Sequence, residues 1–261
     1  MAINLASLQR TRSQRPPRLV VFGSHKIGKS TFAASAPNPV FIQTEDGLDG
    51  IDTTAFPLAK TFDDVLTAIG QLYSEQHSFE TVVLDSLDWT ERLIWSYTAK
   101  MHGKDDIEAF GYSKGYVFAL DQWKLLLDGL NALRNDRGMA VICLAHHAIK
   151  RFDAPDIEPY DRYQIKLHDR ASALVQEWAD VIGFANYEVF TKKTDVGFNK
   201  DVVRGVSTGR RLLHLTERPA FQAGNRYGMP DSVELSWPAF LAGFTKATTS
   251  PPTAEPAAKA A

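Results

Sequence analysis

The chain has 261 residues, a formal net charge of −2 at pH 7 and 44% apolar residues. This length allows one large α/β domain or two small ones, with enough apolar side chains for a sizeable core. The small net charge excludes a molecule-wide field that attracts polyanions, and no apolar run approaches the roughly 18 residues of a membrane span.

Residues 1–17 are expected to form a flexible basic N-terminal arm. Pro16 and Pro17 end the arm before the first strand, and it contains no acidic residue. Its cations are Arg10, Arg12 and Arg15, with Arg18 just beyond. A solvated tail, a segment that contacts phosphates and a segment that docks on a neighbouring subunit are the open interpretations. The arm lacks the apolar stretch of a secretory signal.

A glycine-bounded loop at 23–30, Gly-Ser-His-Lys-Ile-Gly-Lys-Ser, follows an apolar strand at 19–22 and leads into a helix at 29–36. The pattern G-x-x-x-x-G-K-[ST] between a strand and a helix is typical of the P-loop, which binds nucleoside triphosphates; a chance match is the alternative. We expect Lys29 to reach the β- and γ-phosphates of ATP and Ser30 to ligate Mg²⁺. The expected nucleotide-binding residues are Gly23, Ser24, His25, Lys26, Ile27, Gly28, Lys29, Ser30 and Thr31.

Apolar strands alternate with helices after this loop. The expected strands are 40–43, 81–85 and 139–145, and the expected helices are 61–76, 88–101 and 117–135. This alternation predicts an α/β fold with a mostly parallel central sheet flanked by helices. Cys143, the single cysteine, lies in the last of these strands and is interpreted as a core residue. One cysteine excludes an intramolecular disulfide framework, which suits a reducing cytoplasm.

The alternation of apolar strands and helices ends after residue 146. Residues 148–168 are polar and show no clear period, and a helix is expected near 169–178. A strand at 180–190 and turn signals between 191 and 216 predict C-terminal β-hairpins, with short β segments to about 244. The Ala- and Pro-rich segment 245–261 is expected to be disordered. One ATPase domain at 18–244 is the predicted organisation.

Hydrolysis of ATP needs carboxylates near the phosphates. Asp85 ends an apolar strand, as expected of the Walker B carboxylate that holds Mg²⁺ through water; capping of helix 88–101 by Asp85 or Ser86 is the alternative. Since Ser86 stands where many P-loop ATPases carry Glu, the base must come from elsewhere. Glu45 follows strand 40–43, which we expect to end beside the P-loop. Glu45 is the predicted water-orienting base, and a surface acid is the alternative.

Two histidines directly follow strand 139–145. Polar side chains at this edge of the sheet are placed to sense the γ-phosphate, and we assign His147 to this role, with His146 as the other candidate. Histidines satisfied within a loop are the alternative. A zinc site is not expected, because four nitrogen or sulfur ligands at structural spacing are missing.

The order of these features resembles the RecA-like recombinase core. In that family the base is a Glu after the second strand, as at Thr44-Glu45-Asp46, and the sensor is commonly Gln, where this chain has His147. The compact size and the run at 215–230, which includes Leu-Thr-Glu-Arg-Pro and Asn-Arg-Tyr-Gly-Met-Pro, resemble more specifically the phage-encoded Sak-type single-strand annealing ATPases. The resemblance covers residues 18 to about 244.

The resemblance implies two further sites. RecA-fold helicases insert a Lys-x-Arg finger into the neighbouring ATP site, and the matching triplet Gly224-Asn225-Arg226 keeps the arginine; a turn residue is the alternative. Two loops of the family bind single-stranded DNA, and they match 102–116 and about 148–168. The implied DNA-binding residues are Phe110, Tyr112, Lys114, Tyr116, Lys150, Arg151, Arg162 and Lys166. Acidic residues cancel the charge of the second loop, so a solvated mixed-charge loop is equally compatible with its composition.

The function implied by the resemblance is Mg²⁺- and ATP-dependent binding of single-stranded DNA, which promotes strand annealing or exchange in phage-type recombination. The expected catalytic residues are Lys29, Glu45, His147 and Arg226, with Ser30 and Asp85 as metal ligands. The implied partners are single-stranded DNA, further copies of the chain in a ring or filament, and a single-strand-binding protein, in the host cytoplasm and with no membrane. The alternatives are a nucleotide-switched module that binds a protein and a helicase or packaging motor subunit.

Overall fold

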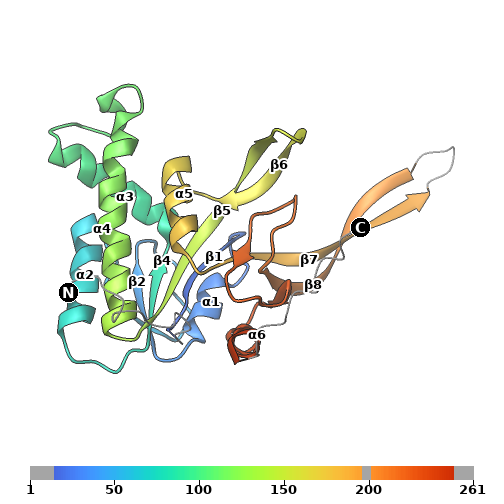
Figure 1. Cartoon of the computed structure of the whole chain (residues 1–261), viewed down its shortest axis with the longest axis horizontal. Helices are drawn as coiled ribbons and strands as arrows, with labels where there is room; N and C mark the ends of the chain where they lie inside the picture. Colours follow the sequence, from blue (N-terminus) through green and yellow to red (C-terminus); the bar gives the residue numbers. More distant parts are fainter. Residues whose placement is uncertain (1–14, 196–200, 250–261) are drawn as a thin grey trace, which may run out of the picture.

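A mostly parallel β-sheet runs through the protein and carries helices on both faces (Figure 1). The computed structural model describes residues 15–195 and 201–249. The expected arm up to residue 14 and the expected tail from residue 250 lie outside the described residues. Within those that are described, no helix is both long and apolar enough to cross a membrane.

The sheet confirms the predicted α/β class. In spatial order its strands are β10 (Ser232–Glu234), β8 (Asp201–His214), β7 (Val181–Asp195), β1 (Arg18–Gly23), β5 (Ala140–Ala154), β4 (Thr81–Asp85), β2 (Pro39–Gln43) and β3 (Thr54–Ala55). The strands from β7 to β3 are parallel, whereas β8 and β10 are antiparallel to their neighbours. β6 (Ile157–Ile165) pairs with β5, and β9 (Gly224–Asn225) pairs with β7.

Helices cover the two faces because successive strand residues point to opposite sides. Val20 and Phe22 of β1 pack toward one core, while Leu19 and Val21 pack toward the other. The first core is closed by α2 (Phe62–Ser74), α3 (Leu87–Met101), α4 (Lys114–Asp136) and α5 (Asp169–Trp178). The second core is closed by α1 (Lys29–Ala34) and α6 (Trp237–Thr249). Cys143 is fully buried in the first core, as predicted, and burial raises the pKa of its thiol to about 12.

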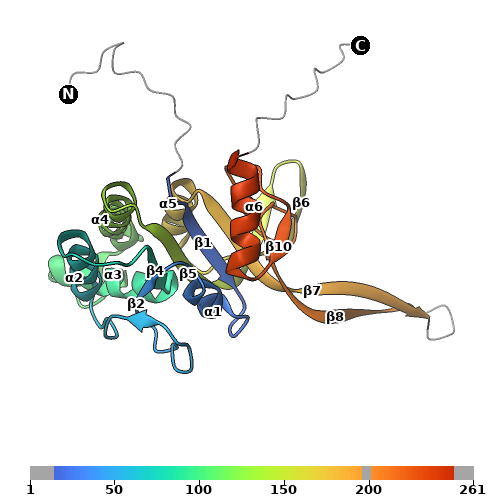
Figure 2. The same cartoon turned by 90° about the horizontal axis from the view of Figure 1, so that it is seen from below.

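Two hairpins leave the sheet. β5 continues past the sheet and turns at Pro155-Asp156 into β6, so that Ala154 pairs with Ile157. β7 and β8 form the second hairpin, which extends far from the rest of the molecule (Figure 2). The predicted C-terminal hairpin is confirmed.

Two expectations about local structure are wrong. The segment 148–168, expected to be irregular, is largely the β5–β6 hairpin. The chain after residue 237, expected to consist of β segments and then a tail, forms α6 as far as Thr249, because the apolar residues Trp237 and Phe240 pack at helical spacing on the second core.

Candidate functional site: a P-loop cavity at the carboxyl edge of the sheet

The P-loop connects β1 to α1 and depends on two glycines. Gly23 packs so closely on β7 that a Cβ atom would lie 2.2 Å from the carbonyl oxygen of Ala185. Gly28 has φ 104°, in the left-handed region that favours glycine. These constraints explain why the pattern needs glycine at both positions, and they place Lys29 at the first position of α1.

Lys29 is buried, and its amino group lies against the loop. Nζ donates to the carbonyl oxygens of Ser24 at 2.9 Å and Gly23 at 3.2 Å. Burial lowers the pKa of this amine, and the carboxylates of Asp85, Asp88 and Glu45 oppose the shift. The ammonium is thus held at the loop by weak neutral acceptors, which the phosphates of a nucleotide can replace with stronger, charged ones.

Ser30 and Asp85 meet across the cavity, as the Walker motifs predict. The hydroxyl of Ser30 donates to Oδ2 of Asp85 at 2.7 Å. Burial raises the pKa of Asp85, and the Ser30 hydroxyl and the Lys29 cation oppose that shift. Ser86, not Asp85, occupies the N-cap position of α3, and its side chain makes no capping bond. The alternative role of Asp85 as a helix cap is therefore not supported.

Glu45 reaches the same cavity by a different route from the expected one. β2 does not lie beside the P-loop strand, because β4 and β5 stand between them. Thr44 ties the end of β2 to β4: its backbone N–H donates to the Asp85 carbonyl at 2.7 Å, and its hydroxyl donates to the Ser86 carbonyl at 3.0 Å. This pairing directs Glu45 into the cavity, where Ser86 Oγ donates to Glu45 Oε2 at 3.4 Å.

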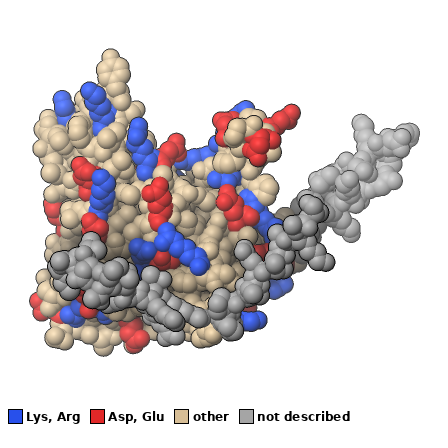
Figure 3. Space-filling view, in the orientation of Figure 1, with Lys and Arg blue, Asp and Glu red and all other residues tan. Residues whose placement is uncertain are grey.

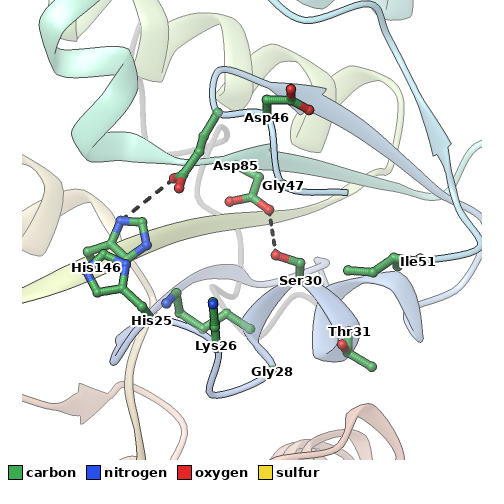
Figure 4. A pocket seen from close by; sticks show the side chains of 12 residues that line it. His25, Lys26, Gly28, Ser30, Thr31, Asp46, Gly47, Ile51, Asp85 and His146 are labelled. Carbon is green, nitrogen blue, oxygen red and sulfur yellow. Dashed lines mark hydrogen bonds and ion pairs between the residues drawn. The ribbon is translucent and has the colours of Figure 1, made fainter. Parts of the chain in front are cut away.

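The structure brings His146, not His147, into the cavity. β1 and β5 pair so that Gly23 lies opposite His146. The ring of His146 stacks on that of His25 with centroids 4.0 Å apart (Figure 4), and Nδ1 lies 3.9 Å from Glu45 Oε2. Since alternate strand residues face opposite sides, His147 packs edge-to-face on Tyr163 instead, with centroids 5.1 Å apart. The sensor assignment therefore moves from His147 to His146.

Asp88, in the first turn of α3, holds His146 in place. It accepts hydrogen bonds from the backbone N–H of His146 at 3.0 Å and from Nδ1 at 3.0 Å. Burial alone would raise the pKa of Asp88, but the hydrogen bonds and charge of His146 outweigh burial and lower it. Repulsion from His146 in turn lowers the pKa of His25.

The cavity has a volume of about 380 Å³. Its walls contain most of the predicted nucleotide-binding residues, together with Glu45, Asp85 and His146 (Figure 4). The lining residues are His25, Lys26, Gly28, Lys29, Ser30, Thr31, Glu45, Asp46, Gly47, Ile51, Asp85 and His146. Gly23, Ser24 and Ile27 belong to the loop but do not line this cavity.

The oxygen donors fit a magnesium ion better than a zinc ion. Within the described ranges, no cluster of three or more His, Cys, Asp or Glu side chains is arranged to hold a metal. Mg²⁺ prefers oxygen ligands and commonly takes one or two from protein and the rest from phosphates and water. Ser30 Oγ and Asp85 Oδ2, which lie 2.7 Å apart beside the P-loop, supply such a pair.

Arg226 lies at the opposite edge of the sheet from the P-loop. Its backbone N–H donates to the carbonyl of Asp180, just before β7, and its guanidinium lies 3.5 Å from the Asp180 carboxylate. Arg18 and Arg134 contact the same carboxylate at 2.7 and 3.4 Å. Arg226 therefore cannot serve the ATP site of its own protomer, and the role in trans stays a prediction.

The first predicted DNA loop separates into exposed and packed side chains. Tyr112 is 98% exposed, and Lys114 beside it is also exposed. Phe110, in the short helix η2 (Glu108–Phe110), contacts the rings of His102 and Phe118, which also stack on each other.

Tyr116 stacks on the ring of His168 with centroids 4.2 Å apart and contacts Glu108 through its hydroxyl. The hydrogen bond to Glu108 raises the pKa of Tyr116 to about 12. Of the four predicted DNA-binding residues in this loop, Tyr112 and Lys114 are exposed and can meet a ligand without rearrangement.

The cations of the second predicted DNA loop are mostly paired with acids. Lys150 lies 2.6 Å from Asp169, and Arg151 lies 3.1 Å from Asp153. Arg162 bonds Glu217 at 2.5 Å and covers the ring of Phe152. Lys166 is exposed at the base of the hairpin and makes no ion pair with any described residue.

On the face drawn in Figure 3, blue and red side chains alternate without forming a continuous basic stripe. The pairing and this distribution agree with the nearly neutral composition of the hairpin.

The sequence analysis does not predict several residues that position the side chains of the cavity. Thr44 ties β2 to β4, Ser86 contacts Glu45 and Asp88 holds His146, while Arg211 of β8 contacts the P-loop. Asp88 carries a usable signal, since it lies three residues after the Walker B acid, in the first turn of the helix that starts at the same edge of the sheet. Arg211 carries none, because its contact depends on the pairing of distant strands.

The fold and the site define a P-loop NTPase. A strand–loop–helix phosphate site, a Walker B carboxylate and the polar side chains of Glu45 and His146 lie together at one edge of a parallel sheet. A family model described as an AAA domain matches residues 15–227, and the chain belongs to this family. The domain is accordingly of the nucleotide-binding, ATPase type. No curated protein matches the sequence.

Proposed function

We propose that the protein is a Mg²⁺-dependent ATPase of the RecA-like, Sak-type class that binds single-stranded DNA and promotes strand annealing or exchange. The observation that carries the proposal is the continuity of β5, which runs from the cavity at His146 into the exposed β5–β6 hairpin. One continuous strand would therefore connect a change at the phosphate site to the surface where DNA would bind. The proposed setting is the bacterial cytoplasm, with phage DNA as substrate.

The cavity residues have complementary roles in hydrolysis. Lys29 would bind the β- and γ-phosphates, and Glu45 would accept the proton of the attacking water. Mg²⁺, when bound, would neutralise charge on the phosphates, and Ser30 and Asp85 would hold it. The 3.4 Å contact with Ser86 restrains the Glu45 carboxylate without neutralising it. His146, held by Asp88, is the side chain placed to respond to the γ-phosphate.

The DNA surface would combine the loop at 102–113 with the β5–β6 hairpin. The hairpin continues β5 beyond the carboxyl edge of the sheet, and the loop follows α3, which begins at the carboxyl end of β4. Tyr112 offers an exposed ring for base stacking, which contributes about 1–3 kcal/mol per base in proteins of this kind. Lys114 and Lys166 supply exposed cations. Lys150, Arg151 and Arg162 would have to exchange their acidic partners for phosphates.

Those ion pairs also support a second candidate function. A hairpin whose cations are already neutralised suits a protein partner as well as DNA, so a nucleotide-switched assembly module is the alternative proposal. Salt separates the two, because phosphate contacts lose affinity steeply as salt rises.

The deciding experiment is the ATPase rate with and without single-stranded DNA at 50 and 200 mM salt. We expect stimulation that weakens at the higher salt and is lost in Tyr112→Ala. Tyr73→Ala is the matched control, because Tyr73 is a half-exposed tyrosine of α2 that bonds Asp136 at the C-terminal end of α4, at the amino edge of the sheet. Hydrolysis indifferent to DNA, with no DNA binding in the presence of an ATP analogue, would favour the protein-binding module.

A further inference from the structure

An arginine of the β7–β8 hairpin contacts the back of the P-loop. Arg211 Nη1 donates a hydrogen bond to the carbonyl oxygen of Ile27 at 3.2 Å, across 184 residues of sequence. A Cβ atom at Gly28 would lie 2.6 Å from the same nitrogen. The guanidinium therefore packs directly against the two residues that precede Lys29, yet it does not line the nucleotide cavity.

Strand pairing explains this contact. Gly23 of β1 pairs with Ala185 of β7, and two residues further on Tyr187 pairs with Arg211 of β8. Leu213, two residues beyond Arg211, packs into the core that α1 helps to close, so strand alternation puts Arg211 on the same face as the P-loop helix. The side chain of Arg211 thus passes over β7, which lies between β8 and β1, to reach the loop.

The neighbouring Arg210 has a different environment. Its Nη1 lies 3.6 Å from Glu188 Oε2, within the hairpin, and the Thr208 hydroxyl donates to the same oxygen at 2.9 Å. The chain therefore offers a matched pair of adjacent arginines on β8: Arg211 contacts the P-loop, and Arg210 contacts the hairpin itself.

We propose that Arg211 is a positioning residue of the nucleotide site that couples the β7–β8 hairpin to the conformation of the P-loop. The inference rests on nucleotide binding at the P-loop, which is part of the proposed function, and does not depend on DNA binding.

The planarity of the peptide bond gives the mechanism. The C=O of Ile27 and the N–H of Gly28 belong to one trans peptide unit and point in opposite directions. A donor that fixes the Ile27 carbonyl on the outer side of the loop therefore fixes the Gly28 N–H toward the inner side, where phosphates bind. The guanidinium also adds positive charge behind the loop.

Coupling of this kind is reciprocal. If Arg211 stabilises the loop conformation that binds phosphate, then bound nucleotide stabilises the Arg211 contact and, through it, the base of the hairpin. The hairpin would then report the state of the nucleotide site to whatever it binds.

The test uses the full-length protein and a fluorescent ATP analogue. We expect Arg211→Ala to raise the dissociation constant for the analogue by about tenfold, the usual effect of losing one charge-assisted hydrogen bond. Turnover at saturating ATP should change little. Arg211→Lys should recover part of the affinity because it retains a charged donor, and Arg210→Ala should bind as the wild type does.

Hydrogen exchange supplies a second readout that a merely structural role would not move. Binding of a non-hydrolysable analogue should slow exchange of β8 amides in the wild type and in Arg210→Ala, but not in Arg211→Ala. Wild-type affinity in Arg211→Ala, or equal weakening in Arg210→Ala, would overturn the role of Arg211 alone. Failure of the wild-type protein to bind the analogue would overturn the proposed ATPase function, and this inference with it.

Discussion

Asp88 fixes His146 at two points, with the backbone N–H of His146 3.0 Å from Oδ1 and the imidazole Nδ1 3.0 Å from Oδ2. A carboxylate on α3 thereby fixes both the backbone and the ring orientation of a residue on β5. Because Nδ1–H is committed to Asp88, Nε2 is the nitrogen left to face the nucleotide.

Replacing His146 should therefore uncouple phosphate sensing. We expect His146→Ala to lower kcat by about 10²-fold, the effect of removing one preorganised polar group from a phosphoryl-transfer site. His147→Ala is the control, because His147 packs on Tyr163 outside the cavity, and its turnover should stay near wild type. Steady-state ATPase assays measure both variants. Equal losses in the two variants, or a larger loss in His147→Ala, would refute the exchange of roles.

Glu45→Gln tests the base. The amide preserves size and can still accept from Ser86, but it cannot take a proton from water. We expect kcat to fall by about 10²–10⁴-fold with nucleotide affinity retained. Asp49→Asn, an exposed acid four residues on that does not line the cavity, should hydrolyse normally. Single-turnover hydrolysis and equilibrium binding of ATP measure the two properties, and loss of binding in Glu45→Gln would argue against a purely catalytic role.

The sequence predicts local parts of the site well and relative placement poorly. The P-loop and Asp85 follow from short patterns whose chemistry is local, and Ser30 does meet Asp85. The choice between His146 and His147 depends on which face of β5 meets the cavity, which the register opposite Gly23 decides. Glu45 does line the cavity, as the sequence predicts, but the predicted neighbourhood of strands is wrong, because β5 and β4 lie between β1 and β2.

The β5–β6 hairpin carries a turn signal in its sequence. Pro155-Asp156 is a favoured turn pair, and apolar and charged side chains alternate next to it at Phe152-Asp153-Ala154 and Ile157-Glu158, although 148–168 as a whole has no clear period. Some acidic partners of the hairpin's cations come from distant segments of the chain, as Glu217 does for Arg162. Periodicity in the sequence does not predict such pairs.

The buried carboxyl of Glu91 should make stability depend on pH. It is 4% exposed, and burial raises its pKa to about 7, opposed by the backbone N–H of His168. A carboxyl with a raised pKa in the folded state binds more protons than in the unfolded state. Its contribution is therefore fully present below the unfolded pKa, near 4.5, and is lost as pH rises through about 7.

Glu91→Gln should remove this dependence. We expect the variant to match the wild type within about 1 kcal/mol at pH 5 and to exceed its stability by about 2–3 kcal/mol at pH 8.5. Urea unfolding at the two pH values measures the difference, and Glu177→Gln, an exposed acid of α5, should leave the wild-type pH dependence intact. Parallel pH profiles for wild type and Glu91→Gln would show that the carboxyl is not strained by burial.

Arg226 tests whether the ATP site is completed by a neighbouring protomer. Within its own protomer this arginine is exposed and shares Asp180 with two better-buried arginines, so Arg226→Ala should lower the free energy of unfolding by less than about 1 kcal/mol. If the side chain acts in trans, the same variant should lose most of its ATPase activity while each protomer still binds ATP.

Mixing experiments separate a trans role from a local one. Lys29→Ala protomers cannot use their own P-loop but retain Arg226, whereas Arg226→Ala protomers retain the P-loop. An arginine acting in trans therefore predicts that a mixture of two nearly inactive variants hydrolyses ATP, with a rate that follows the fraction of mixed interfaces. Mixing Lys29→Ala with Glu45→Gln is the control, because both lesions lie in the same cavity and no interface can restore it. A mixture of Lys29→Ala and Arg226→Ala that stays inactive, or Arg226→Ala that hydrolyses normally alone, would confine Arg226 to its contact with Asp180.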